Sequence, residues 1–368
     1  MRIGIDARLV YYHKAGIGQY ILRLVEALAK VNTEDEFIIW QSRKDHEPIV
    51  NQPNFQHRPL WTPSHHRFEQ ITLPLELATG KMDVLHSPDF IPPFRRNYRS
   101  VITIHDLAFL LYPQFLTRES ARYYGQIDQA VRHTDAIIAV SESTKRDVMR
   151  LLGVPADKIV VVYEAANPIF RPISNAELVQ WVGRRYRIGG DFILFVSTIE
   201  PRKNVSTLLR AYHRLLRDYR PSVKLVLAGA TGWLFQDVLD LVAELGLRDD
   251  VLFLGHVTAE ELLWLYNAAR VLVHPAFYEG FGLTPLEAMA CGTPVIVSNV
   301  SSLPEVVGDA GLFVAPEDVE GWTVAIWRVL SEADLRAQLR EKGLRRARVF
   351  SWKRAALQTL EVYRRVTG

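Results

Sequence analysis

The chain is poor in the residues and runs that mark secreted, membrane-spanning or metal-rich proteins. A single cysteine, Cys291, stands among 368 residues, which excludes an intrachain disulfide and a cysteine-rich metal site. No run approaches the roughly 18 uncharged apolar residues that a membrane-spanning helix needs, and the opening "MRIGIDARLV" lacks the pattern of a signal peptide. Asp-x-Asp triplets are also absent, although hard cations favour clustered carboxylates. We therefore expect a cytoplasmic protein that holds no metal.

An excess of charge of one sign is missing as well. The 44 Lys and Arg against 41 Asp and Glu give a formal net charge of +3. This balance argues against a nucleic-acid partner, because it leaves no basic lobe. Two local basic clusters, 94–99 and 336–350, are interpreted as solvated faces. The alternative for these clusters is weak contact with a membrane surface, which would place the protein peripherally at the inner membrane face.

What the chain does contain is short apolar runs that alternate with amphipathic stretches of helical period. Near-continuous apolar strands of this kind indicate a parallel sheet covered on both faces by helices. In the first half, strands are predicted at 2–7, 36–40, 83–88, 100–106, 135–141 and 158–163, with helices at 18–31 and 141–153. In the second half, strands are predicted at 191–197, 223–229, 251–255, 271–275 and 294–299, with helices at 205–219, 234–247, 259–269 and 284–292.

The repeated pattern predicts an α/β protein of two Rossmann-like, doubly wound domains. Pro168 and Pro172 interrupt the period in the segment 164–177, so we place the domains at 1–168 and 173–350. Ligands of open parallel sheets bind outside the carboxyl ends of the strands. The two sheets are therefore expected to face a cleft, with functional residues directly after strands.

A glycine-bearing loop follows the first predicted strand. Gly16 and Gly18 precede a helix predicted from Gln19. Glycines let a backbone approach an oxyanion, and the positive end of a helix dipole favours a phosphate there. The loop does not match G-x-G-x-x-G, and no acid at the end of a second strand is placed to bind the ribose of a dinucleotide. A nicotinamide cofactor is therefore disfavoured.

In the second domain, "STIEPRKNV" places two cations directly after a buried strand. Lys203 is expected to reach a diphosphate, and Asn204 is expected to cap the next helix. Because successive residues of an extended chain alternate faces, we expect Arg202 to point away from the site, or to pair with Glu200.

Two acids bracket an apolar, glycine-bearing run, "EGFGLTPLE". Glu279 begins a turn at a predicted strand end, and Glu287 lies about one turn inside the following helix. Carboxylates accept hydrogen bonds from vicinal diols, which both a ribose and a hexose present. We therefore interpret the pair as readers of the two ends of a nucleotide sugar, in preference to metal ligands.

Three histidines follow predicted strands. His105 is expected to face the cleft, with Asp106 either orienting its ring or capping the segment that follows. For His86 and His274 we favour a structural role, in which backbone carbonyls satisfy the buried rings.

The motifs E-x7-E, "AMACGTPVIVSN", "LPEVVGDAGLFV" and "EPRKN" together resemble the retaining glycosyltransferases of family four, which share the two-domain GT-B fold. The likeness runs almost end to end, and its second half carries the specific motifs. It implies that the last helix, 352–368, crosses back to pack on the first domain. It also implies that acceptors bind in the first domain.

The resemblance assigns roles residue by residue. Glu279 would contact the donor sugar, Glu287 the ribose, Lys203 the diphosphate and His105 the donor sugar. Further donor contacts would come from the backbone of 280–283 (Gly280, Phe281, Gly282, Leu283), from Gly16 or Gly18, from Arg202 and from Val257 in the nucleobase loop. One departure is Thr198, where many members carry an arginine as a second cation for the diphosphate. Either Arg202 supplies that second charge, or binding of the diphosphate depends mainly on Lys203.

The resemblance implies a retaining, metal-independent transfer of a hexose, with mannose favoured, from a nucleotide diphosphate sugar to a glycan or lipid-linked acceptor. No cofactor is expected. GDP-mannose is the favoured donor and a UDP-sugar the alternative, and same-face attack is favoured over double displacement. A nucleotide-sugar 2-epimerase and a sugar-nucleotide binding protein without turnover are the rival interpretations.

Overall fold

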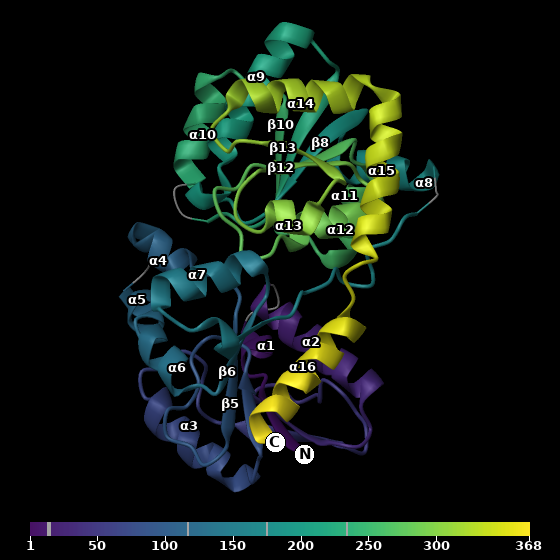
Figure 1. The fold of residues 1–368 in the computed structure, drawn as a ribbon. Coiled ribbons are helices and arrows are strands. Elements are labelled where there is room, and N and C mark those ends of the chain that lie inside the picture. The colour runs from purple at the N-terminus through teal and green to yellow at the C-terminus, as the bar shows by residue number, and fades with distance from the viewer. Residues whose placement is uncertain (13–15, 116–117, 174–175, 233–234) are drawn as a thin grey trace. The chain divides into compact units, whose positions relative to one another are not determined.

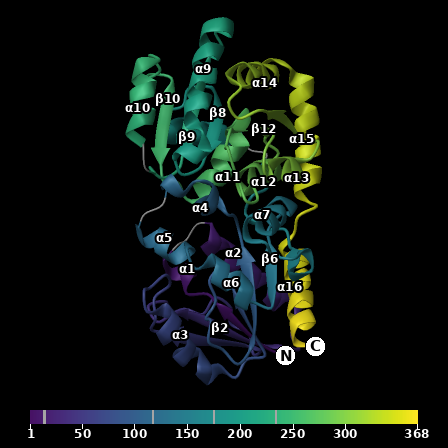
Figure 2. The same cartoon turned by 60° about the vertical axis from the view of Figure 1, so that its left-hand side comes forward.

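The computed structural model describes the chain apart from residues 13–15, 116–117, 174–175 and 233–234. It divides into two compact units (Figures 1 and 2). Unit 1 comprises Met1–Glu164 and Ser351–Gly368, and unit 2 comprises Ala165–Phe350. The first division therefore lies inside the predicted linker 164–177.

Unit 1 is built on a seven-stranded parallel sheet of order β3-β2-β1-β4-β5-β6-β7. Its strands are β1 (Arg2–Asp6), β2 (Glu36–Ser42), β3 (Phe55–Leu60), β4 (Val84–Ser87), β5 (Arg99–Ile104), β6 (Ala136–Ala139) and β7 (Ile159–Val161). Its helices are α1 (Leu9–Tyr12), α2 (Ile17–Val31), α3 (Glu69–Leu77), α4 (Ala108–Leu111), α5 (Arg118–Tyr124), α6 (Ile127–His133), α7 (Glu142–Leu152) and α16 (Trp352–Thr367).

The unbroken apolar run of β2 shows why both faces of this sheet are covered. Phe37 and Ile39 pack in one cluster with residues of α2 and α16. Ile38 and Trp40, which point to the opposite face, pack with Leu73 and Leu77 of α3. Each of these strand residues thus packs against apolar side chains. This packing on both faces fixes the register of β2 in the sheet and places α3 over one face.

The last helix belongs to unit 1, as the resemblance implied. The C-terminal helix α16 lies along α2 in both views (Figures 1 and 2). Tyr363 is fully buried and its hydroxyl lies 2.7 Å from Nδ1 of His86, while Trp352 packs edge-on against Tyr20. These aromatic residues are core contacts that join the end of the chain to the first sheet.

Unit 2 is built on a six-stranded parallel sheet of order β10-β9-β8-β11-β12-β13. Its strands are β8 (Asp191–Val196), β9 (Val223–Ala228), β10 (Val251–Gly255), β11 (Val271–His274), β12 (Val295–Ser298) and β13 (Gly311–Val314). Its helices are α8 (Ala176–Tyr186), α9 (Val205–Tyr219), α10 (Phe235–Glu244), α11 (Ala259–Ala268), α12 (Leu283–Cys291), α13 (Leu303–Val307), α14 (Val319–Ser331) and α15 (Ala333–Ala347).

The two-domain α/β prediction is confirmed, but the sequence analysis missed β3 and β13. Both are the outermost strands of their sheets, so each has a neighbour on one side only. The β3 sequence, "FQHRPL", carries polar residues and a proline, which edge strands tolerate and central strands do not. The apolar signal that identified the other strands is therefore weak in β3.

The strand order identifies one special position in each sheet. In unit 1 the order reverses between β1 and β4, and in unit 2 it reverses between β8 and β11. At such a switch point the following helices depart to opposite faces and leave a crevice at the carboxyl ends of the two strands. Each unit therefore offers a binding position after these two strands.

Candidate functional site

The switch point of unit 2 brings a lysine, a glutamate and a histidine together. Lys203 ends a short 3-10 turn, Pro201–Lys203, that follows β8, while His274 ends β11 and Glu279 follows it. The Lys203 ammonium donates a hydrogen bond to Oε1 of Glu279 at 2.5 Å. Nε2 of His274 lies 2.7 Å from the same oxygen. Residues 76 positions apart in sequence thus form one charged group.

The Glu279 carboxyl remains ionised despite its surroundings. Burial alone would raise the pKa of Glu279, but the Lys203 ammonium, the His274 ring and the Arg202 guanidinium together hold it well below its usual range. The Lys203 side chain is only 11% exposed and that of Glu279 13%. The site therefore presents a fixed, largely desolvated ion pair in which Glu279 is a carboxylate near neutral pH.

His274 corrects the prediction that a backbone carbonyl satisfies its ring. Nε2 contacts the Glu279 carboxylate, whereas Nδ1 is buried and has no hydrogen-bond partner in the described structure. The partners of His86 are also side chains, namely the hydroxyls of Tyr363 and Thr103. His86 nevertheless has the structural role we expected, whereas His274 positions the Glu279 carboxylate.

Arg202 lies on the same side as Lys203, not opposite to it. Because the chain after β8 forms a 3-10 turn, the alternation expected of an extended segment does not apply. Arg202 makes a 2.8 Å ion pair with Glu200, as the alternative interpretation held, and donates to the carbonyl oxygen of Tyr278 at 3.0 Å. Its Nη1 lies 3.8 Å from Oε2 of Glu279, so this cation also borders the site.

Asn204 does not cap α9 with its side chain, which overturns that prediction. It stands at the N-cap position in a left-handed conformation, with φ of 56°, and its side chain accepts no cap hydrogen bond. The amide nitrogen instead donates to the carbonyl oxygens of Pro275 and Pro316, at 3.0 and 2.7 Å. Asn204 thereby ties the turn that carries Lys203 to the segments that follow β11 and β13.

The glycine-bearing turn 279–283 is held by two serines that the sequence analysis missed. Ser302 donates to the carbonyl oxygens of Glu279 and Phe281, at 2.9 and 2.6 Å, and the Glu279 amide donates to Ser301 at 3.0 Å. Gly282 has φ of 111°, and a Cβ there would lie 3.0 Å from a side-chain carbon of Leu303. This backbone conformation at the N-cap of α12 favours glycine. The turn that follows Glu279 thus leads into the N-terminus of α12, the positive end of the helix dipole.

Glu287 lies in α12, near the Tyr266 hydroxyl, which donates to its Oε2 at 3.0 Å. Burial raises the pKa of Glu287 to about 8, although the hydrogen bond from Tyr266 lowers it. The two acids of E-x7-E therefore stand in opposite electrostatic settings, because Glu279 is paired with cations and Glu287 is not. Cys291, at the end of the same helix, is buried as expected, and burial raises the pKa of its thiol to about 12.

The two remaining predicted residues of unit 2 lie in turns after neighbouring strands. Thr198 is exposed and follows β8, and Val257 is buried and follows β10. Both thus stand at the carboxyl edge of the six-stranded sheet, as the sequence analysis expected of functional residues.

In unit 1, the predicted glycines stand at the start of α2. The helix begins at Ile17, not at Gln19, so that Gly16 is its N-cap and Gly18 lies in its buried first turn. Gly16 has φ of 54°, in the region that favours glycine, and open space surrounds the position of a Cβ. The preceding residues 13–15 of the predicted loop lie outside the described part of the chain.

His105 follows β5, and both of its ring nitrogens have partners. Nδ1 lies 2.9 Å from Oε1 of Glu164, and Nε2 lies 3.0 Å from the carbonyl oxygen of Pro88. Burial alone would lower the pKa of His105, but the Glu164 carboxyl and the Pro88 carbonyl raise it above its ordinary value. Asp106 accepts from the Ala108 amide at 2.9 Å, just before α4, so Glu164, not Asp106, orients the ring.

A polar cluster that the sequence analysis missed lies at the β1/β4 switch point of unit 1. Buried Arg8, after β1, pairs with Asp6 at 2.6 Å and with Glu69 of α3 at 2.5 Å. After β4, Asp89 bonds the ring of His65, and its Oδ1 is buried without a described partner. The strand order alone could have indicated the β1/β4 switch point as a binding position. The residues of the cluster, however, come from distant parts of the sequence and form no common motif.

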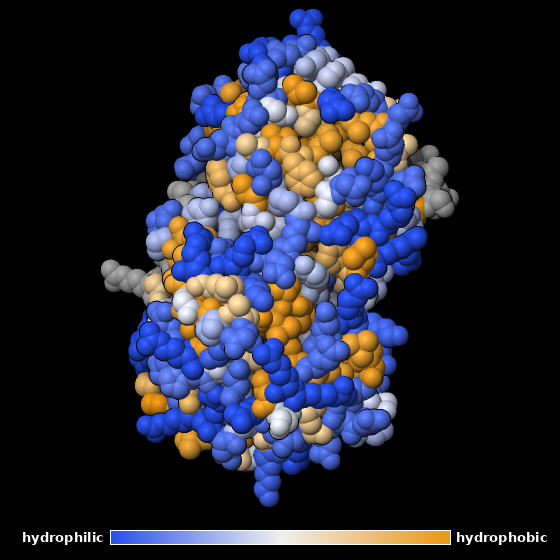
Figure 3. All heavy atoms as spheres, in the orientation of Figure 1, coloured by the Kyte–Doolittle hydropathy of each residue, from blue (hydrophilic) through white to orange (hydrophobic). Residues whose placement is uncertain are grey.

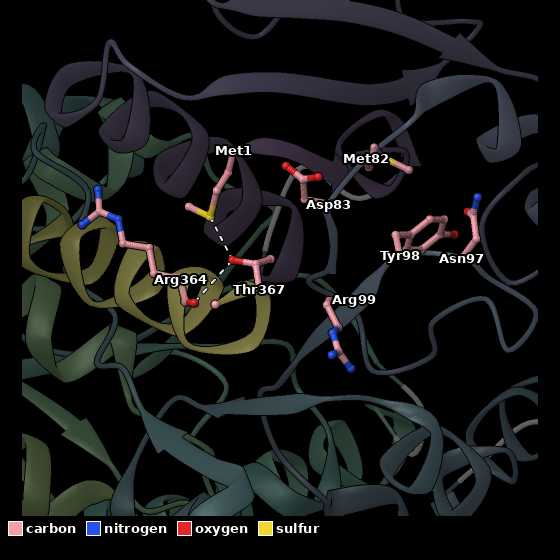
Figure 4. A pocket seen from close by; sticks show the side chains of 9 residues that line it. Met1, Met82, Asp83, Asn97, Tyr98, Arg99, Arg364 and Thr367 are labelled. Carbon is pink, nitrogen blue, oxygen red and sulfur yellow. Dashed lines mark hydrogen bonds between the residues drawn. The ribbon is translucent and has the colours of Figure 1, made fainter.

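A separate pocket of unit 1 lies at the opposite edge of the same sheet. Its lining residues come from the amino ends of β1, β4 and β5 and from the end of α16 (Figure 4): Met1, Met82, Asp83, Asn97, Tyr98, Arg99, Arg364, Thr367 and Gly368. Substrates of parallel sheets bind at the carboxyl edge, so we do not assign the substrate to this pocket. Among the described residues, no group of three or more His, Cys, Asp or Glu is placed to hold a metal ion.

Comparisons with known proteins agree with this geometry. Residues 15–168 match the description Glycosyltransferase Family 4, and residues 187–346 match Glycosyl transferases group 1. O-antigen chain mannosyltransferase B of Escherichia coli is 34% identical over 382 residues, covering 99% of this chain and 100% of that protein. The chain belongs to glycosyltransferase family 4. It is therefore a glycosyltransferase, and the resemblance drawn from E-x7-E and "EPRKN" is confirmed.

Two further known proteins are similar to this family 4 glycosyltransferase, one in sequence and one in structure. Serotype-specific mannosyltransferase WbdA of Escherichia coli is 32% identical over 282 residues, which cover 75% of this chain and 34% of that protein. Sucrose-phosphate synthase of Thermosynechococcus elongatus has a TM-score of 0.80 at 24% identity, covering 100% of this chain and 99% of that one. This structural likeness confirms the GT-B fold.

Proposed function

We propose that this glycosyltransferase transfers mannose from GDP-mannose to a glycan or lipid-linked saccharide, with retention and without a metal ion. The main support is the Lys203–Glu279–His274 group at the β8/β11 switch point, in a chain that matches a mannosyltransferase from end to end. A UDP-sugar is the alternative donor. The polar cluster of unit 1 supports an acceptor site, because carboxylates and an imidazole suit sugar hydroxyls.

The chemistry that this group suits is the departure of a diphosphate from a sugar. As the bond to phosphate breaks, negative charge grows on the leaving oxygens, and fixed cations lower the barrier. Lys203 and Arg202 supply two such cations, and the N-terminus of α12 adds a positive dipole end. Glu279 keeps Lys203 in place and offers its second carboxylate oxygen to a sugar hydroxyl.

A donor screen with EDTA present tests the reaction class. The protein is incubated with GDP-mannose and with UDP-glucose, together with a short mannose-containing acceptor, and products are read by mass spectrometry. We expect transfer, or slow hydrolysis without acceptor, chiefly from GDP-mannose and undiminished by EDTA. An epimerised sugar, or saturable binding without turnover, would establish a rival interpretation. Loss of activity in EDTA that manganese restores would contradict the metal-independent proposal.

The pKa of Glu287 gives a second test, which concerns the ribose contact. Because that pKa is about 8, Glu287 is largely protonated below this pH and becomes a carboxylate above it. The carboxylate is the better acceptor for two ribose hydroxyls, so affinity for guanosine should rise, roughly fivefold, between about pH 6 and pH 8, below the range in which the guanine base loses its own proton. Calorimetry with guanosine avoids titration of phosphates. The Glu287→Gln variant should show a flat profile, and a pH-independent parent would remove Glu287 from the ribose site.

A further inference from the structure

Helix α3 of unit 1 exposes large apolar side chains on its outer side. Phe68, at its N-cap, Ile71 and Leu75 are 47%, 65% and 71% exposed, and their spacing places them on one side of the helix. Trp61, in the segment that leads to α3, is 69% exposed. We call these four residues the α3 face. Figure 3 shows hydrophobic residues among hydrophilic ones where Figure 1 labels α3.

The inner side of α3 is fixed, so the helix cannot turn to bury this face. Leu73 and Leu77 are 1% exposed and pack with Trp40 of the sheet. On the same side, Glu69 pairs with buried Arg8, and Glu76 accepts from the backbone amides of residues 61 and 62 at 2.7 and 3.0 Å. A helix that is apolar both inside and outside needs an apolar neighbour on its outer side.

Arginines border the aromatic residues of the α3 face. The acids of the segment 56–81 are Glu69, which pairs with buried Arg8, and Glu76, which accepts hydrogen bonds from the backbone of 61 and 62; Asp45 and Glu47 follow Arg43 in the neighbouring segment. The cations, in contrast, border the apolar residues. The guanidinium of Arg43 lies 4.1 Å from the Trp61 ring centroid, and that of Arg67 lies 4.7 Å from the Phe68 ring centroid. An apolar face bordered by arginines matches an anionic, partly apolar partner.

We propose that the α3 face docks on the surface of an anionic lipid membrane. Apolar side chains would enter the boundary between headgroups and acyl chains, and the arginines would contact lipid phosphates. A lipid surface fits better than a folded protein, because a stable protein interface involves about 20 to 30 residues a side. The contact is superficial, since no helix in the described ranges is long and apolar enough to cross a bilayer. This inference goes beyond the transfer reaction and is tested without donor or acceptor.

The test is co-sedimentation with vesicles of phosphatidylglycerol and phosphatidylcholine. We expect the parent protein to bind these vesicles more tightly than pure phosphatidylcholine, and less tightly as salt is raised. The double variant Ile71→Ser with Leu75→Ser should lower the partition constant at least about tenfold, because it removes two side chains from the acyl boundary. Arg67→Ala should lower it by roughly fivefold, as expected for one charge near an anionic surface.

The matched control is Leu357→Ser, which removes a side chain of similar exposure, 43%, from α16 of the same unit. This variant should bind vesicles like the parent. Thermal unfolding and nucleoside diphosphate affinity should be unchanged in all variants, which separates lost docking from lost folding. Equal partition of the parent and the double variant, or no preference for anionic vesicles, would overturn the proposal. A dimer that the double variant abolishes, without vesicle binding, would instead identify a second copy as the occupant.

Discussion

Replacing Lys203 by alanine should weaken the binding of a nucleoside diphosphate by a factor of roughly 30 to 150. The ammonium is largely desolvated, and loss of one such charge contact costs about 2 to 3 kcal/mol. Arg202→Ala should have a smaller effect, because Glu200 and the Tyr278 carbonyl already engage that guanidinium. Calorimetry with GDP and UDP on the parent and on each variant measures the difference and identifies the preferred base.

The ion pair with Glu279 makes a second variant necessary. Lys203→Ala leaves the Glu279 carboxylate with His274 and Arg202 alone, so that lost affinity could come from repulsion between this carboxylate and the phosphates. In the double variant Lys203→Ala with Glu279→Gln, that repulsion is gone. The affinity for the nucleoside diphosphate should stay low if Lys203 binds the phosphates directly. Recovery of this affinity would contradict direct binding by Lys203.

A matched lysine elsewhere in unit 2 serves as the control. Lys224, in β9, pairs with Asp250 at 2.8 Å and lies away from the β8/β11 switch point. Lys224→Ala should bind both diphosphates like the parent. Parent-like affinity in Lys203→Ala would remove Lys203 from the phosphate site.

The strands and the residues that follow them could be predicted because burial on both faces leaves a plain signal. Inner strands of parallel sheets are apolar throughout, as in "DFILFV" of β8, and the next residues lie by necessity at the carboxyl edge. That reasoning placed Lys203 and Glu279 correctly at strand ends. It could not predict that the two residues contact each other. Their contact depends on β11 lying beside β8, and local sequence patterns do not predict the order of strands in a sheet.

Other features escaped because a side chain's partner is decided by tertiary structure. Asn204 has the residue type of a helix cap, yet its amide bonds two carbonyl oxygens from other segments. His274 sits at the end of a buried strand, where a carbonyl partner was the natural expectation, and contacts Glu279 instead. Local preference identified these positions as special, but only the assembled sheet shows what each side chain touches.

The apolar residues of α3 illustrate a different limit. Leu73 and Leu77 lie in the core while Ile71 and Leu75 lie outside, although all four are aliphatic and interleaved in sequence. The helix has no single apolar stripe, so the periodic signal that identified α2 is blurred here. The sequence analysis therefore predicted no helix in this segment and did not anticipate its exposed face.

Glu279→Gln should lower kcat by a factor of about 10 to 150 while changing donor affinity less. A contact between the carboxylate and a sugar hydroxyl that strengthens in the transition state is worth roughly 1.5 to 3 kcal/mol. In the parent, the low pKa of Glu279 keeps the carboxylate ionised and bonded to Lys203 and His274. The amide keeps the shape but loses the charge that orders both neighbours.

Steady-state kinetics with saturating acceptor separate the two effects, and Glu244→Gln, an exposed substitution in α10, is the matched control. If Glu279 acts on the sugar in the transition state, kcat falls and the donor KM stays within a few-fold of the parent. If Glu279 only holds Lys203 toward the phosphates, KM rises and kcat is largely retained, because uniform binding is then what is lost. Unchanged kinetics would remove Glu279 from the site altogether, and the Lys203–Glu279 pair would then be structural.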